Sequence, residues 1–407
     1  MRLNMRYVNE SFSTPVKYEC DVCVAGGGIA GIAAAISAAR AGARVILVDR
    51  GFMLGGLATA GIVTIYLPLC DGMGNQVTFG LAEELFHLSI EHAVEDRYPR
   101  AWLEGGSAEE KRATRYEVQF NPQLFAISAE RLLLSHGVKL LYGAPVCGIR
   151  TFEGKITEVM IEGKSGREAI AARSVVDATG DADVCKLAGE NTVNFSQGNL
   201  LAAWYYGYGN GGYDLNMCGF CDIPEEDRKE GQDIPALVNR RFLGLDTEEL
   251  TEMTCLSHAS VEQNLLLKRK EIPGYIPTTV ATIPQIRMTR RIDGVTTLTT
   301  SADGASFPDS VGTFSNWKKR GPVYELPFCA LYGKRIKNLI TAGRCISSDD
   351  AMWDVTRVIP VCAVSGEAAG AAAALSDSFP ELDVSTLQEH LRARGVKIHI
   401  DELGISK

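Results

Sequence analysis

The stretch VCVAGGGIAGIAAAISAARAGARVILVD at residues 22–49 decides the fold class of this chain. It places Gly26, Gly28 and Gly31 in a GxGxxG spacing directly after a short apolar run, and it ends on Asp49. In a nucleotide-binding βαβ unit the first glycine permits a tight turn, and the second lets a pyrophosphate approach the backbone. The third lets the helix pack closely on the sheet.

The same stretch alternates between two kinds of pattern. Short apolar runs at 22–25 and 45–49 predict buried strands, and the Ala-rich residues 29–41 between them predict a helix. The N-terminus of that helix would offer N–H groups and the positive end of its dipole to phosphates. The carboxylate of Asp49 can accept hydrogen bonds from ribose hydroxyls and would repel a 2′-phosphate, which disfavours NADP. A glycine-rich turn alone is a weak signal. Here the predicted strand, the three glycines, the helix and the terminal acid all stand at the spacing of one nucleotide-binding βαβ unit, so we expect a bound dinucleotide.

Composition and charge restrict the class of protein. The chain has 407 residues, of which 46% are hydrophobic and 22% charged, typical of a globular protein with two or three domains. The formal net charge of −9 argues against a nucleic-acid partner and gives no reason to expect binding to a membrane. The apolar stretches 22–49 and 358–376 are interrupted by glycines and charges, so neither predicts a membrane-spanning helix. The N-terminus lacks the apolar core of a signal peptide, and 11 dispersed cysteines favour reduced thiols in the cytoplasm.

Patterns along the chain predict two domains, one of them discontinuous. Short β segments separated by glycine turns fill residues 138–178. They predict a strand of the main sheet, a three-stranded meander and a return strand that ends at Asp177. We therefore expect an α/β fold. A discontinuous Rossmann-like domain, with a parallel sheet plus a three-stranded β-meander, would span 1–190 and 336–407. An inserted α+β domain would span 191–335.

Several segments, in this order, resemble FAD-dependent oxidoreductases with a glutathione-reductase-like (GR2-type) fold. Beyond the fingerprint, the matching segments are GGLATAG at 55–61, LLYGAPVCGI at 140–149, SVVDATGDADV at 174–184, PQIRMTRRIDG at 284–294, LITAGRCISS at 339–348 and RVIPVCAVSGEAAGAAAAL at 357–375. The resemblance covers most of residues 10–376. One departure is Asp49, where the family more often has Glu, and it keeps the charge. The resemblance implies that the discontinuous domain binds FAD noncovalently and that the inserted domain is a substrate or cap domain.

The resemblance also implies which residues hold the cofactor. At the pyrophosphate and the adenosine ribose these would be Gly26, Gly28, Ala30, Gly31, Asp49 and Arg50. Along the flavin, at the adenine and at points of close backbone approach they would be Gly56, Leu57, Ala58, Thr59, Val146, Ala178, Gly180, Gly343, Arg344 and Val361.

The helix that starts near Val358 to Val361 would aim its N-terminus at the flavin N1–C2=O edge. Reduced flavin carries negative charge there, and a helix N-terminus stabilises it by roughly 0.3–2 kcal/mol. Pro360 suits an early helix position, which needs no N–H donor. The small residues of this helix are also explained by close packing against a neighbouring element. Packing does not exclude that the N-terminus of the helix stabilises the flavin charge.

The candidates for substrate chemistry are Arg287, Arg357 and His258. Arg287 belongs to a cationic cluster with Arg290 and Arg291, and could bind a substrate carboxylate, although salt bridges between strands explain such a cluster equally. Arg357, like Arg344, flanks the flavin segment and could neutralise a reduced flavin or an anionic substrate. His258 could transfer a proton, but a histidine in a helical stretch is also commonly an ordinary surface residue.

Cys218 and Cys221 have the CxxC spacing of a dithiol couple or of half a zinc site. Flavin-disulfide enzymes place their pair near the first helix, and no second ligand pair follows here, so chance thiols are the favoured explanation and we expect no metal. The chain also has no second GxGxxG. The sequence therefore does not identify the electron partner, which could be a transiently docking NAD(P)H, a quinone, an electron-transfer protein or oxygen.

The expected activity is hydride transfer between a small organic substrate and flavin N5, in a direction that the residues do not reveal. The alternative is a non-catalytic binding protein that keeps the flavoprotein fold. An RNA-modifying flavoprotein of related fold is disfavoured by the acidic charge. A homo-oligomer is possible.

Overall fold

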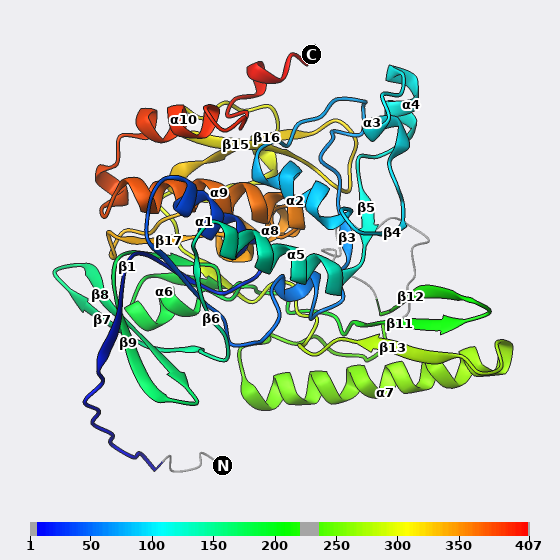
Figure 1. The fold of residues 1–407 in the computed structure, drawn as a ribbon, viewed down its shortest axis with the longest axis horizontal. Coiled ribbons are helices and arrows are strands. Elements are labelled where there is room, and N and C mark those ends of the chain that lie inside the picture. Colours follow the sequence, from blue (N-terminus) through cyan, green and yellow to red (C-terminus); the bar gives the residue numbers. More distant parts are fainter. Residues whose placement is uncertain (1–5, 220–235, 406–407) are drawn as a thin grey trace.

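The computed structural model describes residues 6–219 and 236–405 (Figure 1), and the largest sheet in these residues has seven strands. Its strands follow the order β6-β2-β1-β9-β8-β7, and β17 pairs with the end of β9. The pairs β1–β2, β1–β9, β2–β6 and β9–β17 are all parallel, so these strands end at one edge of the sheet. The parallel strands are β1 (Val16–Ala25), β2 (Val45–Val48), β6 (Lys139–Leu141), β9 (Gly166–Asp177) and β17 (Leu339–Thr341).

The antiparallel part of the sheet differs from the prediction in one respect. β7 (Val146–Phe152) and β8 (Lys155–Gly163) form a hairpin beside β9, as the predicted meander requires. The predicted third meander strand and the return strand are, however, a single strand. The first part of β9 pairs with β8, and its last three residues pair with β17. No glycine or proline follows Gly166 within this strand, so nothing in the sequence turns the chain there.

Two helices rich in small residues cover the sheet. α1 (Ile29–Arg40) and α9 (Ile359–Leu375) lie side by side (Figure 1). The approach is close because α9 presents glycines to the backbone of α1. A Cβ atom at Gly366 would lie 2.3 Å from the carbonyl oxygen of Ala30, and one at Gly370 would lie 2.1 Å from that of Ala34. The small residues of both helices therefore serve their mutual packing.

Further helices and a small sheet surround this pair. α2 (Leu81–Ser89) contacts α9, and α5 (Pro122–Ser135) contacts α1 and α2. Asn121 caps α5, because its side chain accepts the N–H groups of Gln123 and Leu124. The small sheet has the order β3-β5-β4. The remaining elements of these parts are β3 (Ile65–Tyr66), β4 (Val94–Asp96), β5 (Val118–Phe120), α3 (Arg100–Leu103), α4 (Ala108–Ala113), α6 (Asp183–Ala188), α8 (Asp350–Thr356) and α10 (Val384–Arg392).

The described residues between α6 and β17 form three small sheets. The first has the order β12-β11-β13 and lies beside the long helix α7 (Thr247–Glu271) at the lower right of Figure 1. The other two are the pairs β10–β14 and β15–β16. Their strands are β10 (Thr192–Asn194), β11 (Ala203–Gly209), β12 (Gly212–Cys218), β13 (Ile276–Val280), β14 (Arg290–Ile292), β15 (Ser310–Ser315) and β16 (Val323–Pro327).

The mixed α/β fold class is therefore confirmed, with a sheet that contains parallel strands and several antiparallel sheets. The predicted domain boundaries stay predictions. Side chains of β15 and β16, such as Phe314 and Leu326, share one hydrophobic core with those of α1 and α9. Within the described residues, no single helix is long and apolar enough to cross a membrane. α8 and α9 together have sufficient length and apolar composition, with an 88° bend between them.

Candidate cofactor and substrate cleft

A cleft of about 1120 Å³ opens at the edge where the parallel strands end. The turns that follow β1, β2, β9 and β17 line it, starting at Gly26, Asp49, Ala178 and Ala342. In open α/β sheets, ligands bind at the carboxyl ends of the strands. The volume exceeds the roughly 300–1,000 Å³ of ordinary small-ligand pockets, which gives room for a dinucleotide and a second molecule.

The glycines of the first turn have different surroundings. Gly26 has φ +104°, and a Cβ there would lie 2.5 Å from the carbonyl oxygen of Ala178. A Cβ at Gly31 would lie 1.8 Å from the carbonyl oxygen of Gly26. At Gly28, which lines the cleft, a Cβ would meet no described atom within 4 Å. Gly26 and Gly31 thus allow the turn itself, while Gly28 leaves open space in the cleft.

Asp49 lies at the end of β2, half-buried at the cleft. Its Oδ2 accepts the N–H of Gly27 at 2.6 Å, and its Oδ1 accepts the N–H of Gly51 at 2.6 Å. A carboxylate accepts about four hydrogen bonds in total, so capacity remains for ribose hydroxyls. Its neighbours Arg50 and Phe52 also line the cleft.

The N-termini of helices α1 and α9 open onto the cleft. The N-cap residues are Gly28 for α1 and Val358 for α9, and in the described part of the chain no side chain caps either helix. The first-turn N–H groups of a helix have no intrahelical partner, and the dipole is positive there. Pro360 lies in the first turn of α9, as predicted. Both helix ends therefore suit the negative charge of a pyrophosphate or of a reduced flavin.

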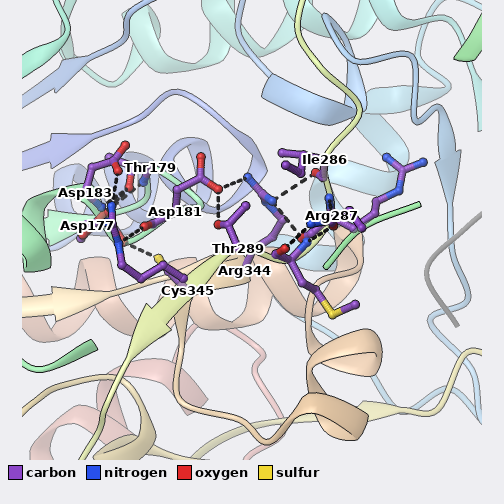
Figure 2. A network of polar contacts seen from close by, with 12 residues as sticks. Asp177, Thr179, Asp181, Asp183, Ile286, Arg287, Thr289, Arg344 and Cys345 are labelled. Carbon is purple, nitrogen blue, oxygen red and sulfur yellow. Dashed lines mark hydrogen bonds and ion pairs between the residues drawn. The ribbon is translucent and has the colours of Figure 1, made fainter. Parts of the chain in front are cut away.

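A polar network connects the turn after β9 with the segment before β14 (Figure 2). Arg344 Nη2 lies 3.2 Å from Asp181 Oδ1, which also accepts the hydroxyl of Thr289 at 2.6 Å. Arg344 Nη1 donates to the carbonyl oxygens of Ile286 and Arg287, at 3.2 and 2.8 Å. Two segments more than 100 residues apart in sequence thus meet at the cleft.

The carboxylates of Asp177, Asp181 and Asp183, at and beside the turn after β9, extend this network. Burial, together with the charges of Asp181 and Asp177, raises the pKa of Asp183 to about 6, and Arg290 and Arg50 offset part of that shift. Arg290 donates to Asp183 at 2.6 Å and to the Asp181 carbonyl at 2.9 Å. Arg290 is therefore part of the support of this turn.

The rest of the cleft is a mainly apolar chamber that one face of α7 lines, where the side chains of Thr251, Cys255 and His258 are exposed. Its apolar lining residues include Val63, Ile65, Leu67, Leu250, Ile283, Pro284 and Ile286. From α7, His258 faces the chamber one turn after Thr254 and Cys255. Arg287 is 3% exposed and its guanidinium lies 5.1 Å from the ring centre of Trp204.

Arg357 lines the cleft directly before the first turn of α9. Its Nε donates to Asp354 Oδ1 at 2.8 Å, and the same buried carboxylate also pairs with Lys318. A buried acid thus holds the guanidinium in place, so its orientation is fixed by α8.

The cleft gathers most of the residues predicted to bind the cofactor and substrate. Those that line it are Gly26, Gly28, Ala30, Asp49, Arg50, Gly56, Leu57, Ala58, Ala178, Gly180, Gly343, Arg344, His258, Arg287 and Arg357. Four predicted residues are not among the described lining residues: Gly31, Thr59, Val146 and Val361. Gly31 and Val361 lie within α1 and α9, the Thr59 hydroxyl bonds to the Leu54 carbonyl, and Val146 begins β7.

Other candidates lie elsewhere. Arg291 donates to the Ile292 carbonyl and to Ser347. Cys218 ends β12, and Cys221 lies outside the described residues. Among the residues with described positions, no group of three or more His, Cys, Asp or Glu side chains could hold a metal. Asp181 and Thr289 were missed as site residues, although they stand in the quoted segments 174–184 and 284–294; Phe52 gave no sequence signal.

The fold and the cleft define a dinucleotide-binding α/β protein. The family model described as FAD dependent oxidoreductase matches residues 21–200 and 202–391, and the chain belongs to this family. It is therefore an oxidoreductase enzyme, and its cofactor is FAD.

Comparison with other proteins gives more distant similarities. No curated protein sequence matches the chain. Similar solved structures include p-nitrophenol 4-monooxygenase PnpA from Pseudomonas putida DLL-E4, at 12% identity and TM-score 0.49, covering 92% of this chain and 84% of that one. Another is a geranylgeranyl bacteriochlorophyll reductase-like protein from Thermoplasma acidophilum, at 12% identity and TM-score 0.44, covering 95% of each chain. At this level they carry no argument about substrate or mechanism.

Proposed function

We propose that the enzyme transfers a hydride between a small organic substrate and N5 of a noncovalently bound flavin. The observation that carries the proposal is the continuity of the cleft. One cavity contains both the glycine turns at the strand ends and the apolar chamber beside α7. A substrate in the chamber would therefore lie next to the cofactor, with water largely displaced by apolar side chains.

The cofactor residues have distinct proposed roles. The α1 N-terminus and the open space at Gly28 would hold the pyrophosphate, and Asp49 with Arg50 would hold the ribose. Bound FAD supplies a ring system that accepts or gives a hydride. The α9 N-terminus would stabilise negative charge on that ring. We also propose that Thr59, Val146 and Val361 contact the cofactor, through the backbone at or next to each residue.

Three side chains would act on the substrate. Arg287 and Arg357 would bind and orient an electron-rich or anionic group, since the buried Arg287 guanidinium lies near the Trp204 ring and Asp354 holds the guanidinium of the half-buried Arg357. His258 would accept or donate the proton that accompanies hydride transfer, because it faces the chamber from α7.

The visible absorption spectrum of the purified protein tests this proposal. We expect two oxidised-flavin bands that bleach with anaerobic dithionite, and acid should release the flavin from the protein. The same bleaching then serves to screen donors, with NADH, NADPH and small alcohols and amines as the first set. A protein that stays colourless after incubation with FAD would contradict the proposal and favour the non-catalytic binding protein.

The electron partner, a homo-oligomeric state and the cytoplasmic location stay predictions. The partner is tested by re-oxidation of the bleached enzyme with oxygen, with a soluble quinone or with an electron-transfer protein, each added separately.

A further inference from the structure

We propose that Arg344 is a positioning residue. Its guanidinium fixes the segment that carries Arg287 to the cofactor-binding turn after β9, and thereby sets where Arg287 lies in the cleft. The inference rests on the proposed function, in which Arg287 orients the substrate. It gives Arg344 a role that differs from direct neutralisation of a flavin or a substrate.

The segment 286–289 needs support from other parts of the chain. It lies directly before β14 and belongs to no helix or strand, so its backbone groups lack a ladder of regular partners. Asn199, which is fully buried, supplies part of the support. Its Oδ1 accepts the N–H groups of both Arg287 and Met288 at 2.9 Å.

Arg344 supports the carbonyl side of the same segment. Its Nη1 donates to the Arg287 carbonyl at 2.8 Å and to the Ile286 carbonyl at 3.2 Å. Both polar backbone groups of Arg287 are therefore held by side chains, Asn199 on the N–H and Arg344 on the carbonyl. The direction in which the Arg287 side chain leaves the backbone follows from these two contacts.

Asp181 connects Arg344 to the cofactor-binding turn. Its Oδ1 lies 3.2 Å from Arg344 Nη2 and accepts the Thr289 hydroxyl at 2.6 Å, so one oxygen binds both the arginine and the supported segment. The guanidinium also lies against Gly180, where a Cβ would come 2.5 Å from Nη2. The substrate-side segment and the cofactor-side turn are thus one hydrogen-bonded unit (Figure 2).

The chemistry of this contact requires arginine in particular. A planar guanidinium donates in fixed directions to one carboxylate and two carbonyl oxygens at once. A lysine keeps the charge and can reach one of these acceptors, but it cannot hold all three in the same geometry. The variant Arg344→Lys therefore separates positioning from charge.

Hydrogen exchange of the FAD-loaded protein tests the proposal. The variants are Arg344→Lys and Arg344→Met, with Arg392→Met as a control because Arg392 forms an exposed ion pair with Glu402 and neither residue lines the cleft. We expect the amides of Arg287 and Met288 to exchange about tenfold faster in both Arg344 variants, while the control matches wild type. The oxidised-flavin spectrum should persist in Arg344→Lys.

Two results would overturn the proposal. If Arg344 acts through its charge alone, Arg344→Lys will protect the two amides as well as wild type does. If its role is general stability, exchange will also accelerate in the central strand β1. Failure of the proposed function is visible separately, since it requires a wild-type protein that does not take up or reduce flavin.

Discussion

At the residue scale, Gly28 and Gly31 show how one fingerprint contains two different requirements. A methyl group at Gly31 would overlap the Gly26 carbonyl oxygen at 1.8 Å, whereas one at Gly28 would project into open space in the cleft. Gly28 also has φ −69°, which alanine adopts without strain. The packing of the protein itself thus requires glycine at residue 31, whereas the requirement for glycine at residue 28 is proposed to come from the ligand.

We therefore expect Gly28→Ala to fold but to bind FAD weakly. Replacing glycine by alanine at an N-cap should change the free energy of unfolding by about 1 kcal/mol or less. The added methyl would occupy the space proposed for the pyrophosphate, so the Kd for FAD should rise about tenfold or more. Flavin fluorescence titration measures the Kd, and urea unfolding of the apoprotein measures stability. An unchanged Kd would show that the pyrophosphate does not bind next to Gly28.

The comparison of these residues with Asp181 shows what the sequence can and cannot predict. Gly26, Gly28 and Asp49 act within one local βαβ unit, so their spacing along the chain is enough to predict their place at the cleft. Asp181 acquires its role from Arg344, which lies 163 residues further on. Contacts of this kind depend on how distant segments pack, and a single sequence carries no signal for them.

At the element scale, the close packing of α9 on α1 depends on Gly370. Alanine is the better helix former by roughly 1 kcal/mol, so propensity alone predicts that Gly370→Ala is stabilising. The added Cβ would lie 2.1 Å from the Ala34 carbonyl oxygen, however, and the two backbones would have to separate. Overpacking of this kind typically costs 1–3 kcal/mol, so the net effect should be destabilising.

Thermal unfolding checks the sign of this prediction. The matched control is Gly212→Ala on β12, where the same methyl would meet no described atom within 4 Å. We expect a lower Tm for Gly370→Ala and nearly no change for the control. A Tm above that of wild type would mean that helix propensity outweighs the α1 contact.

The contact between α9 and α2 predicts a pH dependence of stability. Burial raises the pKa of Glu367 to about 7 from an ordinary value of 4.5, and the Leu81 N–H, 2.7 Å away, offsets part of the shift. The folded protein thus holds this proton more tightly than the unfolded chain does. The stabilising contribution is fully present below about pH 4.5 and is lost as the pH rises through about 7.

Glu367→Gln should flatten this dependence, because glutamine stays neutral and its oxygen can still accept the Leu81 N–H. Between pH 5 and pH 8 the wild type should lose up to about 3 kcal/mol more stability than the variant. Urea unfolding at the two pH values measures the difference. Equal losses in both proteins would show that Glu367 keeps an ordinary pKa.

The elements themselves differ in how well the sequence predicts them. The strand–helix–strand unit of β1, α1 and β2 follows from apolar runs and glycines within 28 residues of sequence, and the structure confirms it. The division of the later region into three small sheets was not predicted. Strands of three to seven residues pair there according to their tertiary neighbours, and their pairing leaves no periodic pattern.

At the scale of the whole molecule, the cleft joins the strand ends of the sheet, the ends of two helices and α7. A ligand there contacts segments from residue 26 to residue 362, so its binding free energy should add to the stability of the folded chain. At 100 times its Kd, FAD should contribute about 2.7 kcal/mol. Unfolding entropy scales with length, so for 407 residues this corresponds to a Tm increase of about 3 °C.

Differential scanning calorimetry of the apoprotein, with and without FAD, measures this increase. Gly28→Ala is the informative partner in the experiment. Its apoprotein should unfold near the wild-type Tm, because its methyl meets open space, but FAD at the same concentration should raise its Tm less. Equal shifts in the two proteins would place the cofactor away from the α1 N-terminus. No shift in the wild type would mean that the cleft does not bind FAD under these conditions, whatever the variant does.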